Sequence, residues 1–231
     1  MNDPLELAFD YLMATRVDKA AAATAEGRLA AIEPAAVQAS LTDDARRLAF
    51  WLDVYNGAVE RHQVRGDGSF AERMRYFRRP IVTVAGQGLS LDAIEHGLLR
   101  RSRWKLGLGY LGNPLPSRFE REHRVDRVDG RIHFALNCGV ASCPPIAAYE
   151  AARIDEQLEL ATASYLRSES ELQGSTLLAP ALLLWYIGDL GGVRGIRRLL
   201  RQHQVEGAGG RIRFKSYDWT PAPGRWSSRQ R

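Results

Sequence analysis

The stretch that decides the fold is RIHFALNCGVASCPP, residues 131–145. Its first half is a short apolar run typical of a buried strand, and its second half holds both cysteines of the chain, Cys138 and Cys143. The double proline at its end can neither continue a strand nor lie deep inside a helix. We therefore expect a strand over residues 132–136 that delivers Cys138 to a tight glycine turn, with a helix after the prolines.

Helices and short strands are expected on both sides of this stretch. Apolar spacing and helix formers predict helices over residues 4–31, 42–59, 92–101, 155–167 and 195–204. Residues 81–89 and 211–215 have strand character, and residues 125–128 are expected to form a hairpin with the strand at 132–136. The pattern predicts an α+β fold in which a small, mainly antiparallel sheet packs with several helices.

The expected domain organisation is one domain with two appendages. Residues 1–40 form an N-terminal helical extension, residues 41–219 form the domain, and residues 220–231 form a loosely ordered tail. Within the domain, residues 105–131 are dense in glycine and proline, which predicts a long irregular loop of the kind that is commonly functional.

Composition limits the classes of function. The chain has 231 residues, 45% of them hydrophobic, so it can bury a sizeable core without disulfide support. The formal charge is +5, but the arginines are scattered apart from two helix-spaced groups, over residues 73–79 and 194–201. Solvated helix faces explain such groups, and nucleic acid is not an expected partner.

No segment approaches the ~20 apolar residues that a membrane span needs. The sequence as given begins with an early acid, Asp3, and shows no basic segment before an apolar core, so it carries no visible signal peptide. We expect a cytoplasmic protein, or an exported one if a signal segment has been removed. The oligomeric state is open.

The central stretch and four further motifs resemble a known family. The central motif is HFALNCGVASCPP, and the others, in chain order, are FWLDVYN (50–56), LDAIEHGLLR (91–100), LWYIGDL (184–190) and YDW (217–219). Together they resemble the domain-of-unknown-function family 547, over nearly the whole chain from Asp43 to Trp219. The family usually has Asn where this chain has Asp53. The resemblance implies no activity, but many domains of this family are attached to other segments, which is compatible with a protein-interaction module.

Cys138 is the leading candidate for chemistry. A cysteine becomes nucleophilic when a helix N-terminus, a histidine or a cation lowers its pKa. His133 is the first candidate for a general base and His96 the second. In a regular strand, His133 and Cys138 would face opposite sides, so the two meet only if the turn reorients the chain. Backbone N–H groups around Gly139 and Ala141 are the expected oxyanion donors.

Other polar residues are expected to support the site. Asp218 could orient a histidine as the third member of a Cys-His-Asp arrangement, or it could simply cap a turn. Asp92, four residues before His96 on a helix, could orient that histidine, whereas Glu95 points elsewhere by about 100°. The remaining expected binding residues are polar or turn residues of the shared motifs: Asp53, Asn56, Glu95, Asn137, Gly139, Ser142 and Cys143.

The sequence therefore predicts a thiol-dependent hydrolase or acyltransferase that acts on a small acyl or peptide substrate. The order of His and Asp is similar to that in papain-like and transglutaminase-like folds, but those folds place the nucleophile upstream on a helix, a position that falls near Asp53 here. Two alternatives stay open: a Cys138/Cys143 dithiol–disulfide redox protein, and a non-catalytic interaction module.

No cofactor is expected. His133, Cys138 and Cys143 are ligand types that zinc accepts, with Asp53, His96 or His123 as a fourth, but the second half of a zinc motif is absent, and we assign no metal. The run GLGYLG at residues 107–112 matches a dinucleotide fingerprint only by its letters, because no strand precedes it and no helix follows it directly.

Overall fold

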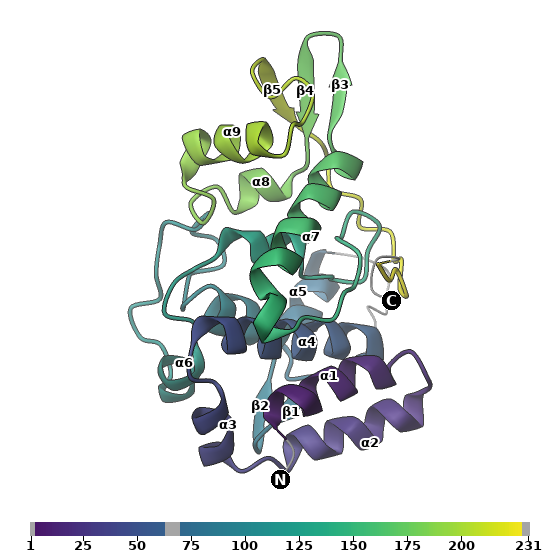
Figure 1. Cartoon of the computed structure of the whole chain (residues 1–231), viewed down its shortest axis with the longest axis vertical. Coiled ribbons are helices and arrows are strands. Elements are labelled where there is room, and N and C mark those ends of the chain that lie inside the picture. Colours follow the sequence, from purple (N-terminus) through teal and green to yellow (C-terminus); the bar gives the residue numbers. More distant parts are fainter. Residues whose placement is uncertain (1–2, 63–69, 228–231) are drawn as a thin grey trace.

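Helices cover most of the chain and two small sheets flank them, so the α+β fold expected from the sequence is confirmed (Figure 1). The structure, a computed structural model, describes residues 3–62 and 70–227. The helices of the first half are α1 (Pro4–Ala14), α2 (Lys19–Ala30), α3 (Pro34–Ser40), α4 (Asp44–His62), α5 (Phe70–Arg78), the π-helix η1 (Ala93–Leu99) and α6 (Arg118–His123). Those of the second half are the 3₁₀ helices η2 (Gly130–Phe134) and η3 (Ala151–Arg153), then α7 (Ile154–Glu169), α8 (Leu182–Trp185) and α9 (Gly192–Gln202).

The strands form two separate sheets. The first is an antiparallel hairpin of β1 (Val82–Val84) and β2 (Gln87–Leu89). The second has the order β3-β4-β5, in which β3 (Glu171–Gln173) runs antiparallel to β4 (Thr176–Ala179) and β5 (Arg211–Phe214) runs parallel to β4.

Aspartates start the first and fourth helices. The side chain of Asp3 accepts a hydrogen bond from the Leu5 amide, which satisfies a donor that the start of α1 leaves free. Asp43 does the same for the Arg46 amide at the start of α4, at 2.9 Å. The capping residue of α4 is therefore Asp43, because its carboxylate reaches an amide in the first turn of the helix.

The lower part of the core forms where α1 crosses α4. Tyr11 of α1 and Trp51 and Tyr55 of α4 are fully buried members of one apolar cluster. A Cβ at Gly57 would lie 2.7 Å from the Tyr11 ring, so only glycine allows this close approach. Residues 3–40 thus share their apolar packing with the segment that follows, and the division at residue 40 stays a prediction.

A second apolar cluster lies at the other end of the molecule. It joins α7, β4, α8 and α9 through buried side chains that include Tyr165, Leu177, Leu183 and Leu200 (Figure 1). The segment at residues 130–136 bridges both clusters, since Ile132 and Leu136 belong to the first and Phe134 to the second.

The strand predicted at residues 132–136 is wrong, and so is its hairpin with residues 125–128. Residues 130–134 form the 3₁₀ helix η2 instead, and the irregular loop before it contains α6. The side chain of Asp129 accepts the Arg131 amide at 2.9 Å and so caps the 3₁₀ helix. Burial on several sides decides the conformation here, because tertiary packing overrides the weak strand preference of the isolated run.

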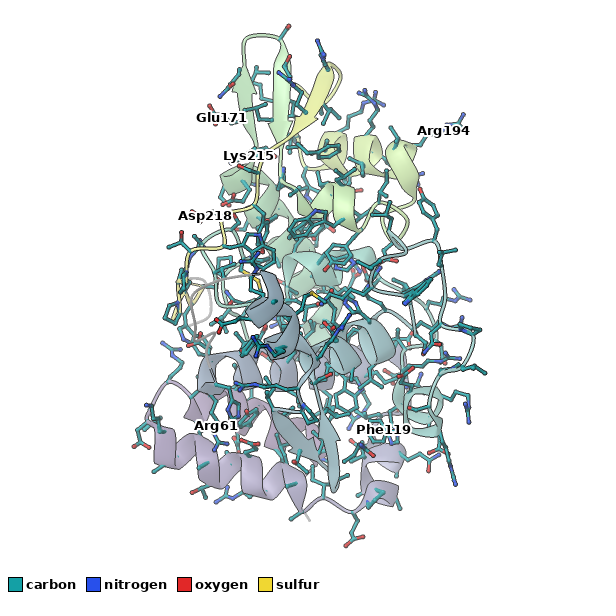
Figure 2. All side chains as sticks on the ribbon, turned by 180° about the vertical axis from the view of Figure 1, so that it is seen from behind. Arg61, Phe119, Glu171, Arg194, Lys215 and Asp218 are labelled. Carbon is teal, nitrogen blue, oxygen red and sulfur yellow. A yellow bond between two sulfur atoms is a disulfide. The ribbon has the colours of Figure 1, made fainter. Side chains whose placement is uncertain are left out.

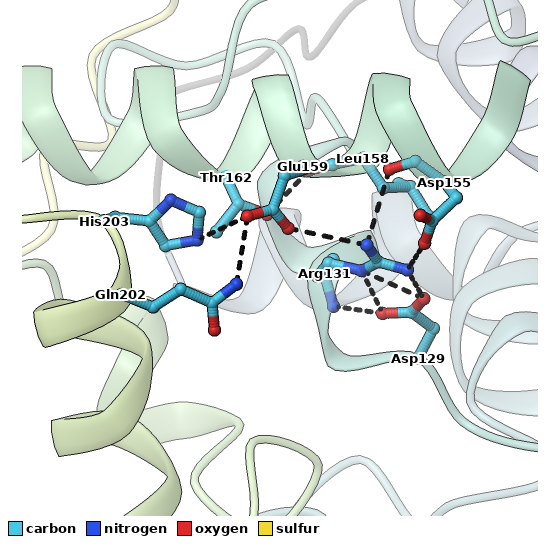
Figure 3. A network of polar contacts seen from close by, with 8 residues as sticks. All are labelled: Asp129, Arg131, Asp155, Leu158, Glu159, Thr162, Gln202 and His203. Carbon is cyan, nitrogen blue, oxygen red and sulfur yellow. Dashed lines mark hydrogen bonds and ion pairs between the residues drawn. The ribbon is translucent and has the colours of Figure 1, made fainter.

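Arg131 fastens η2 to the helices around it (Figure 3). Its guanidinium donates to Asp129 and to Asp155 of α7, both at 2.7 Å, and lies 3.6 Å from the Glu159 carboxylate. Glu159 in turn accepts a hydrogen bond from Gln202 at the end of α9. One arginine therefore connects the segment before the cysteines to α7 and, through Glu159, to α9.

The C-terminal residues that the structure describes, 220–227, run along the cysteine turn. Backbone hydrogen bonds join Ala141 to Thr220, Ala222 to Gly139 and Ile146 to Arg225. These contacts hold residues 139–146 against the C-terminal segment.

Asp53→Asn tests the buried carboxylate of α4. Asp53 is 1% exposed and accepts a hydrogen bond from the Tyr149 amide at 2.9 Å, and burial raises its pKa well above the ordinary value. The unfolded chain loses this proton near pH 4, whereas the folded chain holds it to higher pH, so the parent loses stability as pH rises above about 4. The asparagine keeps the acceptor oxygen without the charge, so we expect it to melt at a higher temperature than the parent near pH 7, with the difference shrinking toward about pH 4. A variant that melts below the parent across this range would contradict the interpretation.

Candidate functional site

A cavity of about 410 Å³ lies where the two apolar clusters meet. Its wall combines side chains from α4, α5, η1, η2, α8 and the segment after β5. The apolar and aromatic lining consists of Tyr55, Met74, Phe77, Leu106, Leu108, Leu136, Leu182, Trp185, Tyr186, Tyr217 and Trp219. The chemistry-bearing lining is Asp92, Glu95, His96, His133 and Cys138. Four predicted site residues, Glu95, His96, His133 and Cys138, therefore share one cavity, although they come from three separate segments.

Two asparagines hold the turn that presents Cys138. The Asn56 side chain donates to the Ala135 carbonyl and accepts from the Asn137 amide at 3.0 Å. Asn137 then accepts the Gly139 amide and donates to the Pro144 carbonyl. Gly139 has φ of +82°, a conformation that glycine adopts without strain. The predicted binding residues Asn56, Asn137 and Gly139 thus shape the turn rather than line the cavity.

Cys138 and Cys143 form a disulfide whose Cα atoms are 6.0 Å apart. The two sulfurs differ in environment: Cys138 is half-buried and lines the cavity, whereas Cys143 is 2% exposed. The Cys143 sulfur accepts a hydrogen bond from the Cys138 amide at 3.0 Å, and the Tyr217 hydroxyl lies 3.2 Å from it. A reagent in the cavity therefore reaches Cys138 first, and Cys143 has donors ready for a departing thiolate.

The amides predicted to bind an oxyanion are already in use. The Gly139 amide donates to Asn137 at 2.7 Å, and the Ala141 amide donates to the Thr220 carbonyl at 2.8 Å. The turn and the segment at residue 220 therefore occupy these two amides in the structure.

His133 is held by a buried carboxylate that the sequence did not single out. Its Nε2 lies 2.9 Å from Asp189 Oδ2, and Arg100 Nε donates to the same oxygen at 2.6 Å. The side chains of His133, Arg100 and Asp189 are at most 1% exposed. The His133 ring also stacks on Tyr186, with ring centres 3.5 Å apart.

These contacts fix the protonation of His133. A carboxylate only accepts, so Nε2 carries the proton and Nδ1 of the neutral ring keeps its lone pair. Burial lowers the pKa of His133, although the hydrogen bond to Asp189 opposes the shift. Burial alone would raise the pKa of Asp189, but hydrogen bonds from His133 and Arg100 outweigh it and lower that pKa. Near neutral pH the pair is a neutral imidazole oriented by a carboxylate.

His96 differs from His133 in which of its ring nitrogens the protein already uses. Arg100 Nη1 lies 2.9 Å from His96 Nδ1, and since a guanidinium only donates, Nδ1 is the acceptor. The proton of the neutral ring is therefore on Nε2, which is buried, has no hydrogen-bond partner among the described residues, and lies 3.7 Å from Asp92 Oδ1. Burial lowers the pKa of His96, so the ring is neutral near pH 7 and offers a donor rather than a base.

Glu95 connects the two histidines to Tyr186. Its carboxylate accepts the Tyr186 hydroxyl at 2.7 Å and lies 3.5 Å from His96 Nδ1. Burial alone would raise the pKa of Glu95, but its electrostatic interactions with the His96, His133 and Arg100 side chains and the Tyr186 hydrogen bond lower it. The π-helical turn of η1 places Glu95, His96 and Arg100 on this network, as π-turns at functional sites commonly do.

The other predicted site residues lie elsewhere. Asp218 is exposed, and its carboxylate accepts the Thr220 amide, so the structure gives it the turn-capping arrangement and gives His133 to Asp189. Ser142 accepts the Asp218 amide and its carbonyl accepts the Tyr165 hydroxyl. Asp53 does not line the cavity. Over residues 3–62 and 70–227, no group of three or more His, Cys, Asp or Glu is arranged to hold a metal ion.

Sequence reasoning missed Asp189, Arg100 and Tyr186. All three lie in motifs that carry the family resemblance, LDAIEHGLLR and LWYIGDL. A buried arginine at the end of one motif and an aspartate after a glycine in the other were the available signals, because buried charges need partners.

The fold and the site define an α+β protein with a cysteine and two histidines around one apolar cavity. The sequence model of the family described as Protein of unknown function, DUF547 matches residues 39–166, more than half of the chain. The chain belongs to this family, although the match is shorter than the span that the motifs suggest. No curated protein and no solved structure matches the chain. Among the described residues, no helix is long and apolar enough to span a membrane.

Asp189→Asn should destabilise the protein strongly, because it leaves the buried Arg100 charge without its counter-ion. Breaking one partner of such a pair costs about 3–5 kcal/mol. Urea unfolding near neutral pH measures the loss, and Asp218→Asn is the matched control, since that carboxylate is exposed. The difference in unfolding free energy between Asp189→Asn and the parent should narrow in acid. The pKa of Asp189 is lowered in the folded protein, so its contribution to stability is complete above about pH 4 and falls as pH drops further. Equal unfolding free energies for the two variants would contradict the anchoring role of Asp189.

Proposed function

We propose that this protein is a thiol-dependent hydrolase or acyltransferase in which Cys138, once reduced, attacks an acyl substrate in the cavity. The observation that carries the proposal is that Cys138 and a carboxylate-oriented, neutral His133 line the same cavity. A cysteine, a histidine base and an orienting acid are the parts that nucleophilic thiol catalysis needs.

His133 serves as the general base in this scheme. Its Nδ1 lone pair takes the thiol proton as the sulfur attacks the acyl carbon, and it returns a proton to the leaving amine or alcohol. Water, or an acceptor hydroxyl or amine, then attacks the thioester, and His133 takes the proton of that nucleophile. Asp189 keeps the ring in the required tautomer throughout.

In this scheme His96 supplies the oxyanion donor, because the Gly139 and Ala141 amides are already hydrogen-bonded. Its Nε2–H is buried, has no hydrogen-bond partner in the part of the chain that the structure describes, and belongs to a residue that lines the cavity. A donor of this kind is suited to the negative oxygen of a tetrahedral intermediate. The preference of His133 as base over His96 follows from the same contacts, because Arg100 occupies the His96 lone pair.

The disulfide has to open before this chemistry begins. A small thiol or dithiol reductant attacks the Cys138 sulfur, Cys143 departs as a thiolate and takes up a proton, and a second thiol releases Cys138 from the mixed disulfide. The half-buried Cys138 and buried Cys143 fit the roles of attacked and departing sulfur.

The same asymmetry favours a second candidate function. Dithiol–disulfide exchange with a substrate thiol would use Cys138 as the exchanging sulfur and Cys143 as the resolving one, without any acyl intermediate. The existing Cys138–Cys143 bond is the observation that favours it.

The deciding experiment uses Cys143→Ser, which leaves Cys138 as the single thiol. We expect its alkylation by iodoacetamide to show an apparent pKa below ~8.5. We also expect one equivalent of p-nitrophenolate to be released from p-nitrophenyl acetate, with the acetyl group located on Cys138 by mass spectrometry. His133→Gln should slow acylation by about a hundredfold or more, and Asp218→Asn is the control that should change neither rate.

The outcomes separate the functions. Slow alkylation with an ordinary thiol pKa and no acetyl adduct contradicts the hydrolase. If the parent chain then exchanges its disulfide rapidly with glutathione, the redox function replaces it. A parent whose two reduced thiols react slowly and equally supports a non-catalytic interaction module instead.

A further inference from the structure

We propose that residues 101–115, together with the start of α9, form a docking surface for an anionic lipid membrane. Large apolar side chains are unusually exposed there. Of the twelve large hydrophobic residues that are exposed in the described chain, six lie between residues 104 and 115. They are Trp104 (61%), Leu106 (80%), Leu108 (46%), Tyr110 (59%), Leu111 (53%) and Leu115 (86%).

Exposure on this scale marks an interaction surface. A soluble domain gains nothing by leaving contiguous apolar side chains in water, so such a patch needs an occupant. In Figure 1 the segment runs along one side of the molecule between α6 and α9. Val193, 60% exposed at the start of α9, continues the patch, since the Tyr110 hydroxyl lies 3.4 Å from where a Gly192 Cβ would be.

The composition of the patch fits a lipid headgroup region. Tryptophan, tyrosine and leucine beside arginine and lysine are the side chains that membrane interfaces favour. Residues 101–119 contain four cations and no acidic residue. Lys105 forms an ion pair with Asp92 and Arg118 with Glu122, so Arg101 and Arg103 supply the positive charge of this segment. Arg194 is exposed at the start of α9, and Figure 2 shows it on the same side of the molecule as Phe119, which follows this segment. A surface of this charge is complementary to anionic lipid.

The patch is a built structure rather than a loose loop. An antiparallel bridge between Arg103 and Gly112 closes it, and the Trp104 amide donates to the Leu111 carbonyl at 2.9 Å. At its centre, Gly109 has φ of +86°, and a Cβ there would lie 2.5 Å from the Asp189 amide. The Gly188 amide donates to the Leu108 carbonyl at 2.7 Å. Gly107 and Gly109 are buried, whereas Trp104, Leu111 and Leu115 are exposed to solvent, an arrangement suited to an insertion loop.

The surface also borders the cavity. Lys105, Leu106 and Leu108 belong to its wall, so docking would bring the mouth of the cavity against the lipid. The proposal does not depend on the thiol chemistry, since vesicle binding is measured without turnover and with the disulfide intact.

Co-sedimentation tests it, using vesicles of phosphatidylcholine with and without phosphatidylglycerol. We expect the full chain to bind the anionic vesicles, with binding that weakens as salt rises. Trp104→Ser/Leu106→Ser should lower the partition coefficient by about tenfold or more, and Arg101→Gln by about fivefold. The matched controls are Val17→Ser/Leu160→Ser and Arg28→Gln, which remove exposed side chains outside the patch and should leave binding unchanged.

Three results would overturn the proposal. The parent does not bind anionic vesicles at low salt, the loop and control variants lose the same share of vesicle binding, or the parent and all variants bind equally well. Thermal melting of each variant confirms folding, and Leu115→Ser provides a second apolar substitution if the double variant does not fold. A parent that ignores vesicles but dimerises through this patch would replace the lipid with a protein partner.

Discussion

One buried carboxylate, that of Asp189, organises the centre of the molecule. Its Oδ2 holds both Arg100, the residue that ends η1, and His133 of η2, while Asp189 itself follows α8. An arginine with no exposed surface needs a counter-ion, because an isolated buried charge is prohibitively costly. The relative placement of these three segments is therefore constrained by charge as well as by apolar packing. Gly109 and Gly130 lie so close to the Asp189 backbone that a Cβ at either position would collide with it.

The position of Arg100 also determines which ring nitrogen of each histidine donates and which accepts. Arg100 lies between them: through Asp189 it helps to orient His133, and directly it occupies Nδ1 of His96. Among the described residues, His133 consequently keeps an unused lone pair and His96 an unused N–H, although both are buried neutral imidazoles near pH 7. A base and a donor on the same cavity wall are what acyl chemistry requires, and neither role could be assigned without knowing where the arginine points.

Sequence reasoning reached the family, the α+β class, the helices of the amphipathic segments and four of the residues that line the cavity. These succeeded because periodicity and motif spacing are local properties. It failed at residues 130–136, where burial on several sides replaced the expected strand with η2, and at the orienting acid, where Asp218 is locally as plausible as Asp189. Which carboxylate reaches His133 depends on a contact across 56 positions, and no local pattern contains it.

The placement of Gly109 joins the surface patch to the network of Asp189, Arg100 and His133. A residue with a side chain there would collide with the amide and carboxylate of Asp189, so the exposed loop and the orienting acid occupy one rigid junction. Movement of the loop on contact with a partner surface would reach Asp189 through the Gly188–Leu108 hydrogen bond and then His133. Close packing transmits such displacements because it leaves no space in which they can be absorbed. The GLGYLG run, whose letters match a nucleotide fingerprint, has its physical cause here: its central glycine is required by the buried carboxylate beneath it.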